Sequence, residues 1–297
     1  MIIVAANPYS GASDNRRHVE TLVRELAALG QRARVVWDAR ERAAALNDRA
    51  AMSGCRAVVA AGGDGTIAQV INELPAGTPL AVLPAGNENL FAGAFGFGDD
   101  PAALARALDA CRTRAVDLGR ASLPGASRLF ALMLTAGLDA EVVRRMAAWR
   151  ASGEALRRVR RGSYVAPIAA SLATYRHAPV RIVATDTTTS GAYCIVANAP
   201  AYALGLPLAP DARADDGALD WVMFERRGLV AAAAYTWAVW RRRHLARTDV
   251  RAGRATRLTV DAAVPVPVQV DGDPLGTTPV EIEVLPRALT VVATDAG

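Results

Sequence analysis

Short, largely apolar runs alternate with longer amphipathic segments over about the first 120 residues. The runs hold at most one charged residue each, which is typical of strands buried on both faces of a parallel sheet; they are residues 1–8, 33–37, 55–61 and 79–85. Between them, apolar residues such as Val19, Leu22 and Leu26 recur at helical spacing. The predicted helices are 14–30, 38–52, 66–74, 87–95 and 101–111. This alternation predicts an open parallel α/β domain.

After about residue 120 the pattern changes to short segments of strand character separated by turn residues. These segments are 127–137, 178–186, 192–200, 218–225, 254–262, 266–273, 280–286 and 288–295. Arginine-rich helical candidates interrupt them at about 140–177 and 228–246. We therefore expect a mainly antiparallel β-sandwich as a second domain. The expected domains are 1–119 and 120–297, and the last strand, about 287–297, is a candidate to return to the first domain.

The composition is that of a well-cored globular protein, with 52% hydrophobic and 21% charged residues. All 34 basic residues are arginines, because the sequence contains no lysine, and the formal net charge is +5. A phosphate-binding loop of the Walker A type and Schiff-base catalysis both require a lysine, so both are excluded.

The spacing of cysteine and histidine argues against two further kinds of site. Cys55, Cys111 and Cys194 are far apart, which favours a reducing compartment without a disulfide framework. The three histidines are equally scattered and offer no zinc-ligand spacing. The beginning of the sequence is typical of a strand rather than a signal peptide, and the apolar stretch 228–240 is too short to span a bilayer.

The strand that ends near Ala61 is followed by a glycine-rich corner, residues 62–65, and by a helix expected to begin at about Thr66. Glycines permit close backbone approach, and the N–H groups at a helix start attract phosphate; Thr66 is the expected N-cap. Asp64 in this corner would repel a phosphate unless Mg²⁺ or a hydroxyl lay between them. An ordinary strand–turn–helix corner explains the same residues.

Two further corners repeat this design, NPYSG at 7–11 and LPAGNENLFA at 83–92. Together with GGDGT at 62–66, they resemble the diacylglycerol kinase catalytic family, and more narrowly its soluble bacterial lipid kinases and their sphingosine kinase relatives. ARADDGALDW at 212–221 and VDGDPLG at 270–276 resemble segments of the same family, so the resemblance covers essentially the whole chain. GGDGT alone is shared with NAD kinases and phosphofructokinases. The resemblance implies a nucleotide-binding α/β domain of that type, followed by an antiparallel β-sandwich.

The resemblance also implies that the three corners bind ATP, with Asp64 near Mg²⁺ or the nucleotide. The residues that would bind the nucleotide are Asn7, Ser10, Gly62, Gly63, Asp64, Gly65, Thr66, Gly86, Asn87 and Asn89. Arg16 or Arg17 could add a cation, but a solvated helix face explains both arginines more readily.

The family's catalytic base is the last acid of a DGE turn in the second domain. That acid is Asp273 here, and it would orient or deprotonate the lipid hydroxyl. Asp271 is the alternative base, and Asp64 is the third catalytic candidate. A hairpin turn would explain the D-G-D sequence without any catalysis. Asp117 matches a family aspartate that helps to arrange the carboxylate network.

The turn at 212–221 matches a family turn that binds a structural Mg²⁺ largely through backbone carbonyls. The residues that carry over are Arg213, Asp216 and Ala218, and oxygen ligands of this kind suit a hard cation. A β-turn without an ion explains the same residues.

The sequence departs from the family pattern at four positions. Asn87 stands where the glycine-rich motif has Thr, and Leu90 stands where an Asp is common. Val36 replaces an adenine-side Thr, and Asp273 is one methylene shorter than the usual Glu. These departures bear on nucleotide preference and activity more than on the fold.

Arginine and tryptophan occur together at 144–165 and at 237–247, a composition typical of helices that lie at anionic headgroups. A basic solvent face with Trp in the core is the alternative. We expect a cytoplasmic protein, with peripheral contact at the inner membrane face and a homodimer left open. No nucleic-acid partner is expected, because no recognised module is present.

Three functions follow. The first is an ATP- and Mg²⁺-dependent lipid kinase that phosphorylates a hydroxyl of a diacylglycerol-like or sphingoid lipid at a membrane surface. The second is a soluble-substrate kinase of the NAD kinase type, which GGDGT and the order of an α/β and then a β-rich domain allow, although the NENLFA segment and the D-G-D turn argue against it. The third is a non-catalytic lipid- or nucleotide-binding protein on the same fold, which the departures at Leu90, Val36 and Asp273 allow.

Overall fold

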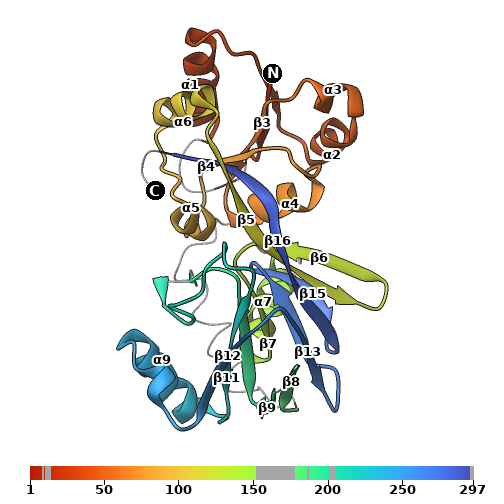
Figure 1. Cartoon of the computed structure of the whole chain (residues 1–297), viewed down its shortest axis with the longest axis vertical. Coiled ribbons are helices and arrows are strands. Elements are labelled where there is room, and N and C mark those ends of the chain that lie inside the picture. Colours follow the sequence, from red (N-terminus) through yellow and green to blue (C-terminus); the bar gives the residue numbers. More distant parts are fainter. Residues whose placement is uncertain are drawn as a thin grey trace. The chain divides into compact units, whose positions relative to one another are not determined.

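The computed structural model describes residues 1–8, 10, 15–151, 178–185, 187–200, 202 and 205–294. It divides into two compact units, Met1–Asp117 with Arg287–Gly297 as unit 1 and Leu118–Pro286 as unit 2. Figure 1 shows the elements of each unit, coloured along the sequence. The chain passes from unit 1 to unit 2 within strand β5 (Thr113–Leu123) and returns within strand β16 (Val280–Val292).

Unit 1 is built on a parallel sheet. Its strands follow the order β2 (Ala33–Val36), β1 (Ile2–Ala6), β3 (Ala57–Gly62), β4 (Leu80–Pro84) and the end of β16. Ile2 pairs with Ala57 of β3, and Val58 pairs with Leu80 of β4. All residues of β1 and β3 are buried, as expected for strands that helices cover on both faces. The predicted parallel α/β domain is therefore confirmed.

Most helices of unit 1 bury an apolar stripe of the predicted kind. In the first of them Val19, Leu22 and Leu26 are buried. The helices are α1 (Asn15–Ala28), α2 (Ala39–Asn47), α3 (Arg49–Ser53), α4 (Asp64–Glu73), α5 (Leu90–Phe95) and α6 (Pro101–Ala110). The single helix predicted for 38–52 is two helices, because the Asp48 side chain accepts the N–H groups of Ala50 and Ala51 and starts α3 anew.

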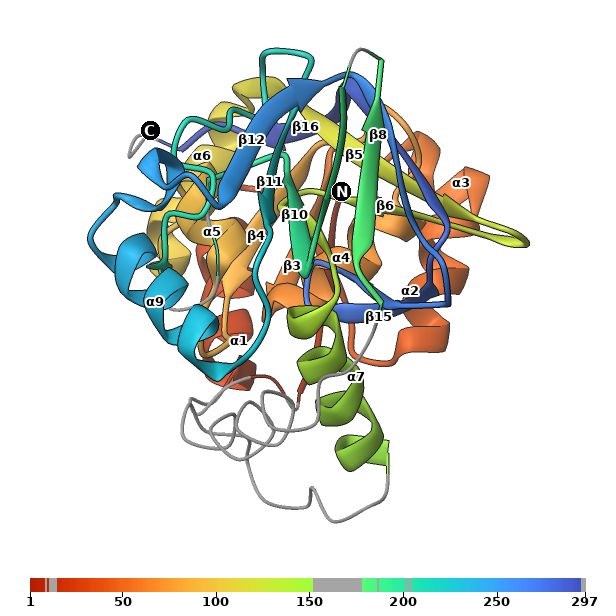
Figure 2. The same ribbon diagram turned by 90° about the horizontal axis from the view of Figure 1, so that it is seen from below.

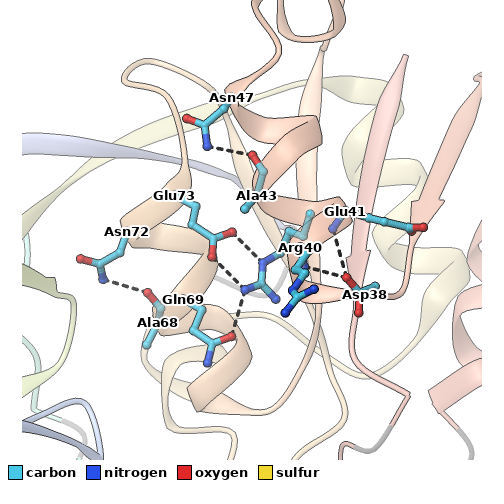
Figure 3. A network of polar contacts seen from close by, with 10 residues as sticks. Asp38, Arg40, Glu41, Ala43, Asn47, Ala68, Gln69, Asn72 and Glu73 are labelled. Carbon is cyan, nitrogen blue, oxygen red and sulfur yellow. Dashed lines mark hydrogen bonds and ion pairs between the residues drawn. The ribbon is translucent and has the colours of Figure 1, made fainter.

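A buried arginine fastens α2 to α4. Arg42, which is 7% exposed, donates from Nε and Nη2 to the two oxygens of Glu73, at 2.7 and 2.8 Å. Its Nη2 also donates to Gln69 Oε1 at 3.0 Å. Figure 3 shows Gln69 and Glu73 of α4 turned toward α2. The pair is bidentate and largely desolvated, so it fixes the helix that begins at the GGDGT corner.

Unit 2 consists of two sheets with a shared core. One sheet contains β6 (Ala126–Phe130), β5, β16, β13 (Arg257–Ala262), β8 (Val180–Ala184) and β9 (Thr187–Gly191). The other follows the order β12 (Val250–Ala255), β11 (Leu219–Phe224), β10 (Tyr193–Ala197), β7 (Met133–Ala136), β14 (Pro267–Val270) and β15 (Asp273–Thr277). Phe130 and Ile182 of the first sheet and Trp221 and Val268 of the second belong to one apolar cluster. This is the predicted antiparallel β-sandwich.

Among its described residues, unit 2 has the helices α7 (Leu138–Ala151) and α9 (Leu229–Trp240) and the short 3-10 helix η4 (His244–Ala246). The helical candidate at 140–177 and the basic stretch at 144–165 lie outside the described residues from 152 onward. Among the described helices, none has both the length and the hydropathy needed to cross a bilayer.

Two predicted segments differ from the structure. Residues 127–137 form two strands in different sheets, β6 and β7, because the chain turns from one sheet to the other at Ala131–Leu132. Residues 280–286 and 288–295 form one strand, β16, which continues through Arg287 with a positive φ of 55°.

Candidate functional site

The carboxyl ends of β1, β3 and β4 bring the three glycine-rich corners together in unit 1. The backbone N–H of Asn7 donates to Ala61 O at 3.0 Å, and its side-chain amide donates to Thr66 Oγ1 at 3.2 Å. The buried Asn15 amide donates to the carbonyls of Asn7 and Ala61, at 2.7 and 3.1 Å. Asn15 therefore ties the first corner to the second, a role that its position in the sequence did not reveal.

The second and third corners touch through glycine backbones. A Cβ added to Gly86 would lie 2.7 Å from the Cα of Gly63, and one added to Gly63 would lie 3.1 Å from the Cα of Gly86. A Cβ on Gly62 would lie 2.6 Å from Thr66 Oγ1. Only glycine allows this approach, so these three positions are required by packing as well as being candidates for ligand contact.

Helix α4 begins at Asp64 rather than at Thr66, so the predicted N-cap is wrong. Gly63 is the N-cap residue, and no side chain caps the helix among the described residues. Thr66 is buried in the first turn, and its hydroxyl accepts from Asn7 instead. The Ser10 hydroxyl accepts the Gly63 N–H at 3.4 Å. The start of α4 is thus left to backbone N–H groups, which suit an anion.

Asp64 has one bound and one open carboxylate oxygen. Its Oδ1 accepts the backbone N–H of Phe91 at 3.0 Å, in the first turn of α5. Its Oδ2 has no hydrogen-bond partner among the described residues. Leu90, which departs from the family pattern, is the first residue of α5. Asp64 therefore links the second corner to the third and keeps one oxygen available for a cation or hydroxyl.

The remaining nucleotide candidates lie around the same corner. Asn89 has a left-handed conformation, with φ 52°, and its side chain bonds the N–H and carbonyl of Gly86, at 2.8 and 3.1 Å. Gly65 and Asn87 are exposed, and an added Cβ on Gly65 would meet nothing within 4 Å. Asn89 thus shapes the loop, whereas Gly65 and Asn87 border open space.

Three other predicted positions are accounted for by packing in unit 1. The Arg16 guanidinium lies 4.8 Å from the centroid of the Trp37 ring, a cation–π geometry. Asp117 is fully buried and accepts the backbone N–H of Arg287 at 2.7 Å, so it holds β5 to β16. Val36 is buried at the end of β2.

In unit 2, Asp271 lies in a hairpin turn and binds backbone. Asp271 and Gly272 both have positive φ, 46° and 85°, as in the tight turn that Asp-Gly favours between two strands. The Asp271 carboxylate accepts the N–H groups of Ala131, Leu132 and Met133, at 2.7, 3.0 and 2.9 Å. This carboxylate fastens the β14–β15 turn to the segment that joins the two sheets.

Asp273 follows the turn and is half-buried. Its Oδ2 accepts from Arg128 Nη2 at 2.6 Å, with the Asp273 and Arg128 side chains 31% and 23% exposed. Its Oδ1 has no hydrogen-bond partner among the described residues. Of the two turn acids, Asp273 is therefore the one with an oxygen available to a substrate.

A buried polar network supports the same turn, and sequence reasoning missed it. Asp139 accepts from Tyr202 OH at 2.5 Å, from Thr135 Oγ1 at 2.7 Å and from Gln269 Nε2 at 3.0 Å. Gln269 Oε1 in turn accepts the Gly272 N–H at 2.8 Å. Burial and the Asp139 charge raise the pKa of the Tyr202 phenol, so it remains a donor. The feature of the sequence that could have revealed this network is the presence of polar Thr135 and Gln269 within otherwise apolar strands.

The turn at 212–221 does not fit the implied structural Mg²⁺. The Arg254 guanidinium contacts Asp216 Oδ2, and Asp216 Oδ1 accepts the Ala218 N–H at 3.2 Å. Arg213 pairs with Asp215 at 3.0 Å. Asp220 Oδ1 lies 3.6 Å from Arg254 Nε. The Arg254 guanidinium thus already pairs with the Asp216 carboxylate, and among the described residues no group of three or more His, Cys, Asp or Glu side chains could hold a metal ion.

Comparison with known proteins agrees with these features. The diacylglycerol kinase catalytic domain matches residues 1–121, and the YegS C-terminal NAD kinase beta sandwich-like domain matches residues 133–293. Two solved structures from Bacillus anthracis str. Sterne share this fold, the first described as a "putative diacylglycerol kinase" and the second as a diacylglycerol kinase. They have TM-scores of 0.76 and 0.70 and are 20% and 19% identical, covering 99% of this chain and 95% and 97% of theirs.

Closer sequence relatives come from Pseudomonas aeruginosa strains PAO1 and UCBPP-PA14, each named "Probable lipid kinase YegS-like". Each is 31% identical to this chain over 274 residues, which are 90% of this chain and 84% of the relative. The fold, the corners of unit 1 and these matches lead to one conclusion. The chain belongs to the diacylglycerol kinase catalytic family, alongside the YegS-like lipid kinases.

Proposed function

We propose that the protein is an ATP-dependent lipid kinase that transfers the γ-phosphate to a hydroxyl of a diacylglycerol-like or sphingoid lipid. Membership of a kinase family makes it a phosphotransferase and implies ATP use. The observation that carries the proposal is the interlocking of three corners, in which Gly63 packs on Gly86, Asn7 bonds Thr66, and Asp64 bonds Phe91. Packing alone does not require an uncapped helix start and an open carboxylate oxygen at the same place.

The nucleotide phosphates would bind at the start of α4. Gly65 is exposed and open, no side chain among the described residues caps the helix, and the backbone N–H groups there attract anions. The open Oδ2 of Asp64 fits a hard cation, and Mg²⁺ bound there with ATP would neutralise charge on the phosphates. Because the chain contains no lysine, the remaining phosphate contacts at this corner would come from backbone amides.

The acceptor hydroxyl would be oriented by Asp273 in unit 2. Its open Oδ1 can accept the hydroxyl proton, whereas Asp271 has both oxygens bound to backbone N–H groups. Arg128 fixes the Asp273 side chain from the other oxygen. A general base within hydrogen-bond reach of the hydroxyl contributes roughly 10²–10⁴-fold to the rate.

Transfer of label from γ-labelled ATP to a panel of diacylglycerols, monoacylglycerols and sphingoid bases tests the proposal directly. We expect Mg²⁺-dependent phosphorylation of at least one lipid, and a loss of about 100-fold or more in Asp64→Asn and in Asp273→Asn. Asp99→Asn, an exposed aspartate in the same unit as Asp64, is the control and should keep full activity.

Three outcomes would overturn the proposal or its residue roles. Label transfer to NAD rather than to any lipid would replace the lipid substrate with a dinucleotide. ATP binding without turnover on any acceptor would make the chain a non-catalytic binding protein. Full lipid phosphorylation by Asp64→Asn or Asp273→Asn would remove that residue from the reaction.

A further inference from the structure

Helix α9 lies at the edge of unit 2 beside β12 (Figures 1 and 2). Together with the residues that follow it, this helix carries an exposed surface of apolar and arginine side chains. We call it the Trp–Arg face. It is composed of Leu229, Val230, Trp237, Trp240, Arg241, Arg242 and Arg243. The four apolar residues are 64%, 84%, 61% and 60% exposed, respectively. Exposure of this extent for large apolar side chains on one helix marks an interaction surface.

The apolar residues form one stripe. Residues 230, 233, 237 and 240 follow the i, i+3, i+4 spacing of a single helix face, while Tyr235, Ala238 and Val239 on the other side are buried in unit 2. The helix is therefore apolar on both sides, although water covers only the outer one. A surface helix of a globular domain normally places polar residues there.

Arginines border the stripe at its C-terminal end. The Arg241 guanidinium lies 5.8 Å from the centroid of the Trp237 ring, and the Trp237 and Trp240 rings lie 5.1 Å apart. Trp237, Ala238, Arg241, Arg243 and Arg247 line a hollow of about 310 Å³. The Arg247 guanidinium is paired with Asp249, so Arg241 and Arg243 are the arginines of this hollow that remain for a ligand. Arginine beside tryptophan suits a phosphate that is attached to an apolar group.

The nearby acids do not offset this charge. Residues 226–248 contain six arginines and no Asp or Glu. Asp249 is 5% exposed and is paired with Arg247 at 2.8 Å and with Arg226 at 3.2 Å. Glu225 is paired with Arg251 at 2.8 Å. Residues 241–243 are exposed arginines that form no ion pair among the described residues, so their positive charge is available to an anionic partner.

We propose that the Trp–Arg face docks the protein on the surface of a bilayer that contains anionic phospholipid. Trp237, Trp240, Leu229 and Val230 would enter the headgroup region, and the arginines would bind the lipid phosphates. The helix has 12 residues, about 18 Å, which is too short to span a bilayer but long enough to lie in its surface. Exposed Trp and Arg side chains occur together at such interfaces.

Co-sedimentation with vesicles tests the docking surface in the absence of ATP and of any substrate lipid. The vesicles are phosphatidylcholine, with or without phosphatidylglycerol. We expect binding to the anionic vesicles that weakens as salt is raised. Arg241→Gln/Arg242→Gln/Arg243→Gln should weaken it roughly 100-fold, and Trp237→Ala/Trp240→Ala by about tenfold or more.

The matched control is Arg34→Gln/Arg40→Gln/Arg49→Gln, which removes the same charge from exposed arginines of unit 1. It should bind like the unmodified protein. Equal loss in this control, or equal binding to vesicles without phosphatidylglycerol, would overturn the proposal. So would a dimer that dissociates in the Trp double variant, or binding to single-stranded RNA that vesicles cannot displace.

Depth of insertion gives an independent measurement. Phospholipids brominated on the acyl chains quench tryptophan only when its ring reaches them. We expect quenching in the unmodified protein and its loss in Trp237→Phe/Trp240→Phe, which should still bind because Phe keeps the apolar surface. Unchanged quenching in that variant would show that another of the five tryptophans inserts, and would overturn the assignment.

This inference extends the proposed function, and the two can fail separately. Phosphorylation of a short-chain lipid dissolved as monomers needs no docking, so it should be unchanged in the Trp237→Ala/Trp240→Ala variant while phosphorylation of the same headgroup in anionic vesicles falls. Activity on monomers without vesicle binding would remove the docking surface alone. Vesicle binding without activity on any lipid would remove the kinase assignment alone.

Discussion

Asp271 and Asp273 stand two residues apart in one turn and are bound in different ways. Three backbone N–H groups hold the Asp271 carboxylate, whereas one guanidinium holds Asp273. Hydrogen bonds to a charged acceptor are stronger than neutral ones, and leaving the buried donors without a partner is costly. The first acid therefore serves the fold, whereas the second keeps one carboxylate oxygen without a hydrogen-bond partner among the described residues.

Substitution of the two acids should lower the free energy of unfolding by different amounts. Asp271→Asn loses the charge and one acceptor oxygen, and we expect the free energy of unfolding in urea to fall by about 2–4 kcal/mol. Asp273→Asn should cost about 1 kcal/mol or less, because its ion pair is partly exposed. Its lipid phosphorylation should nevertheless be lost. Equal stability loss in both variants would contradict this division.

Glu141 in α7 gives a pH prediction. Burial opposes its ionisation, but hydrogen bonds and charges from Arg144 and Arg145 outweigh burial and lower its pKa from 4.5 to about 2. Because the folded-state pKa is depressed, the stabilisation is fully present above pH 4.5 and is lost as pH falls toward 2. Glu141→Gln should therefore lower the free energy of unfolding by about 1–3 kcal/mol at pH 7.

The free energies of unfolding of Glu141→Gln and of the unmodified protein should become more similar as the pH is lowered. Urea unfolding at several pH values between 7 and 3 measures the difference, which should shrink below pH 4.5. A difference that stays constant down to pH 3 would mean that the Glu141 charge does not stabilise the fold.

At the scale of elements, the contact between the β3–α4 and β4–α5 corners depends on Gly63 and Gly86. In Gly86→Ala the new Cβ would lie 2.7 Å from the Gly63 Cα, so one corner must move. We expect a loss of about 1–3 kcal/mol in stability and weaker ATP binding by calorimetry. Gly65→Ala is the control for stability, because its Cβ meets open space. Unchanged ATP affinity in Gly86→Ala would show that the contact does not shape the nucleotide site.

The pairing of β11 with β12 bears on whether Mg²⁺ stabilises the fold. Asp220 lies directly opposite Arg254 in this register, and Arg254 also reaches Asp216. Without nucleotide, the melting temperature should not change when Mg²⁺ or EDTA is added. In Arg254→Met the acids lose their cation, at a cost of about 1 kcal/mol because the pair is partly exposed.

Added Mg²⁺ should partly restore the melting temperature of Arg254→Met, and Arg251→Met on the same strand should show no such response. An unmodified protein whose melting temperature falls in EDTA would contradict the assignment of Arg254 as the resident cation.

The elements themselves were largely predictable, and the corners were too. Wholly apolar runs and helical stripes located β1, β3, β4 and α1, because these elements bury their residues within short stretches of sequence. The prediction of Thr66 as the N-cap was wrong because the helix begins two residues earlier, at Asp64, with Gly63 as its N-cap. The capping preference of threonine therefore did not decide the boundary.

Long-range contacts could not be predicted. The donors to Asp271 are residues 131–133, and the guanidinium at Asp216 comes from the neighbouring strand. The metal turn was interpreted from its own sequence, in which Arg254 does not appear. Which acid of 271–273 serves the fold likewise depends on pairing across some 140 residues.

At the scale of the whole molecule, one strand contributes to two cores. Val280 of β16 is fully buried in the sandwich core of unit 2, and Val291 of the same strand is fully buried in unit 1, opposite Leu80 of β4. The two valines lie in different units although 11 residues separate them along one strand.

Substitution of either valine should therefore speed amide hydrogen exchange in a different unit. Val291→Ala and Val280→Ala each remove the same two methyl groups from a core, at about 2 kcal/mol. We expect faster exchange of β3 and β4 amides in the first variant, and of β13 and β8 amides in the second. Faster exchange throughout the molecule in both variants would mean that the units unfold as one.

The double membership of β16 also limits how the molecule can be divided. No single cut yields two complete halves, because residues 1–117 lack the strand that covers β4 until residues 287–294 are supplied. A peptide with that sequence should therefore bind the 1–117 fragment and complete its sheet. For the same reason, a chimera that takes unit 1 from a relative would have to take both the first 117 residues and the last strand. Such a chimera has two junctions, one after Asp117 and one before Arg287.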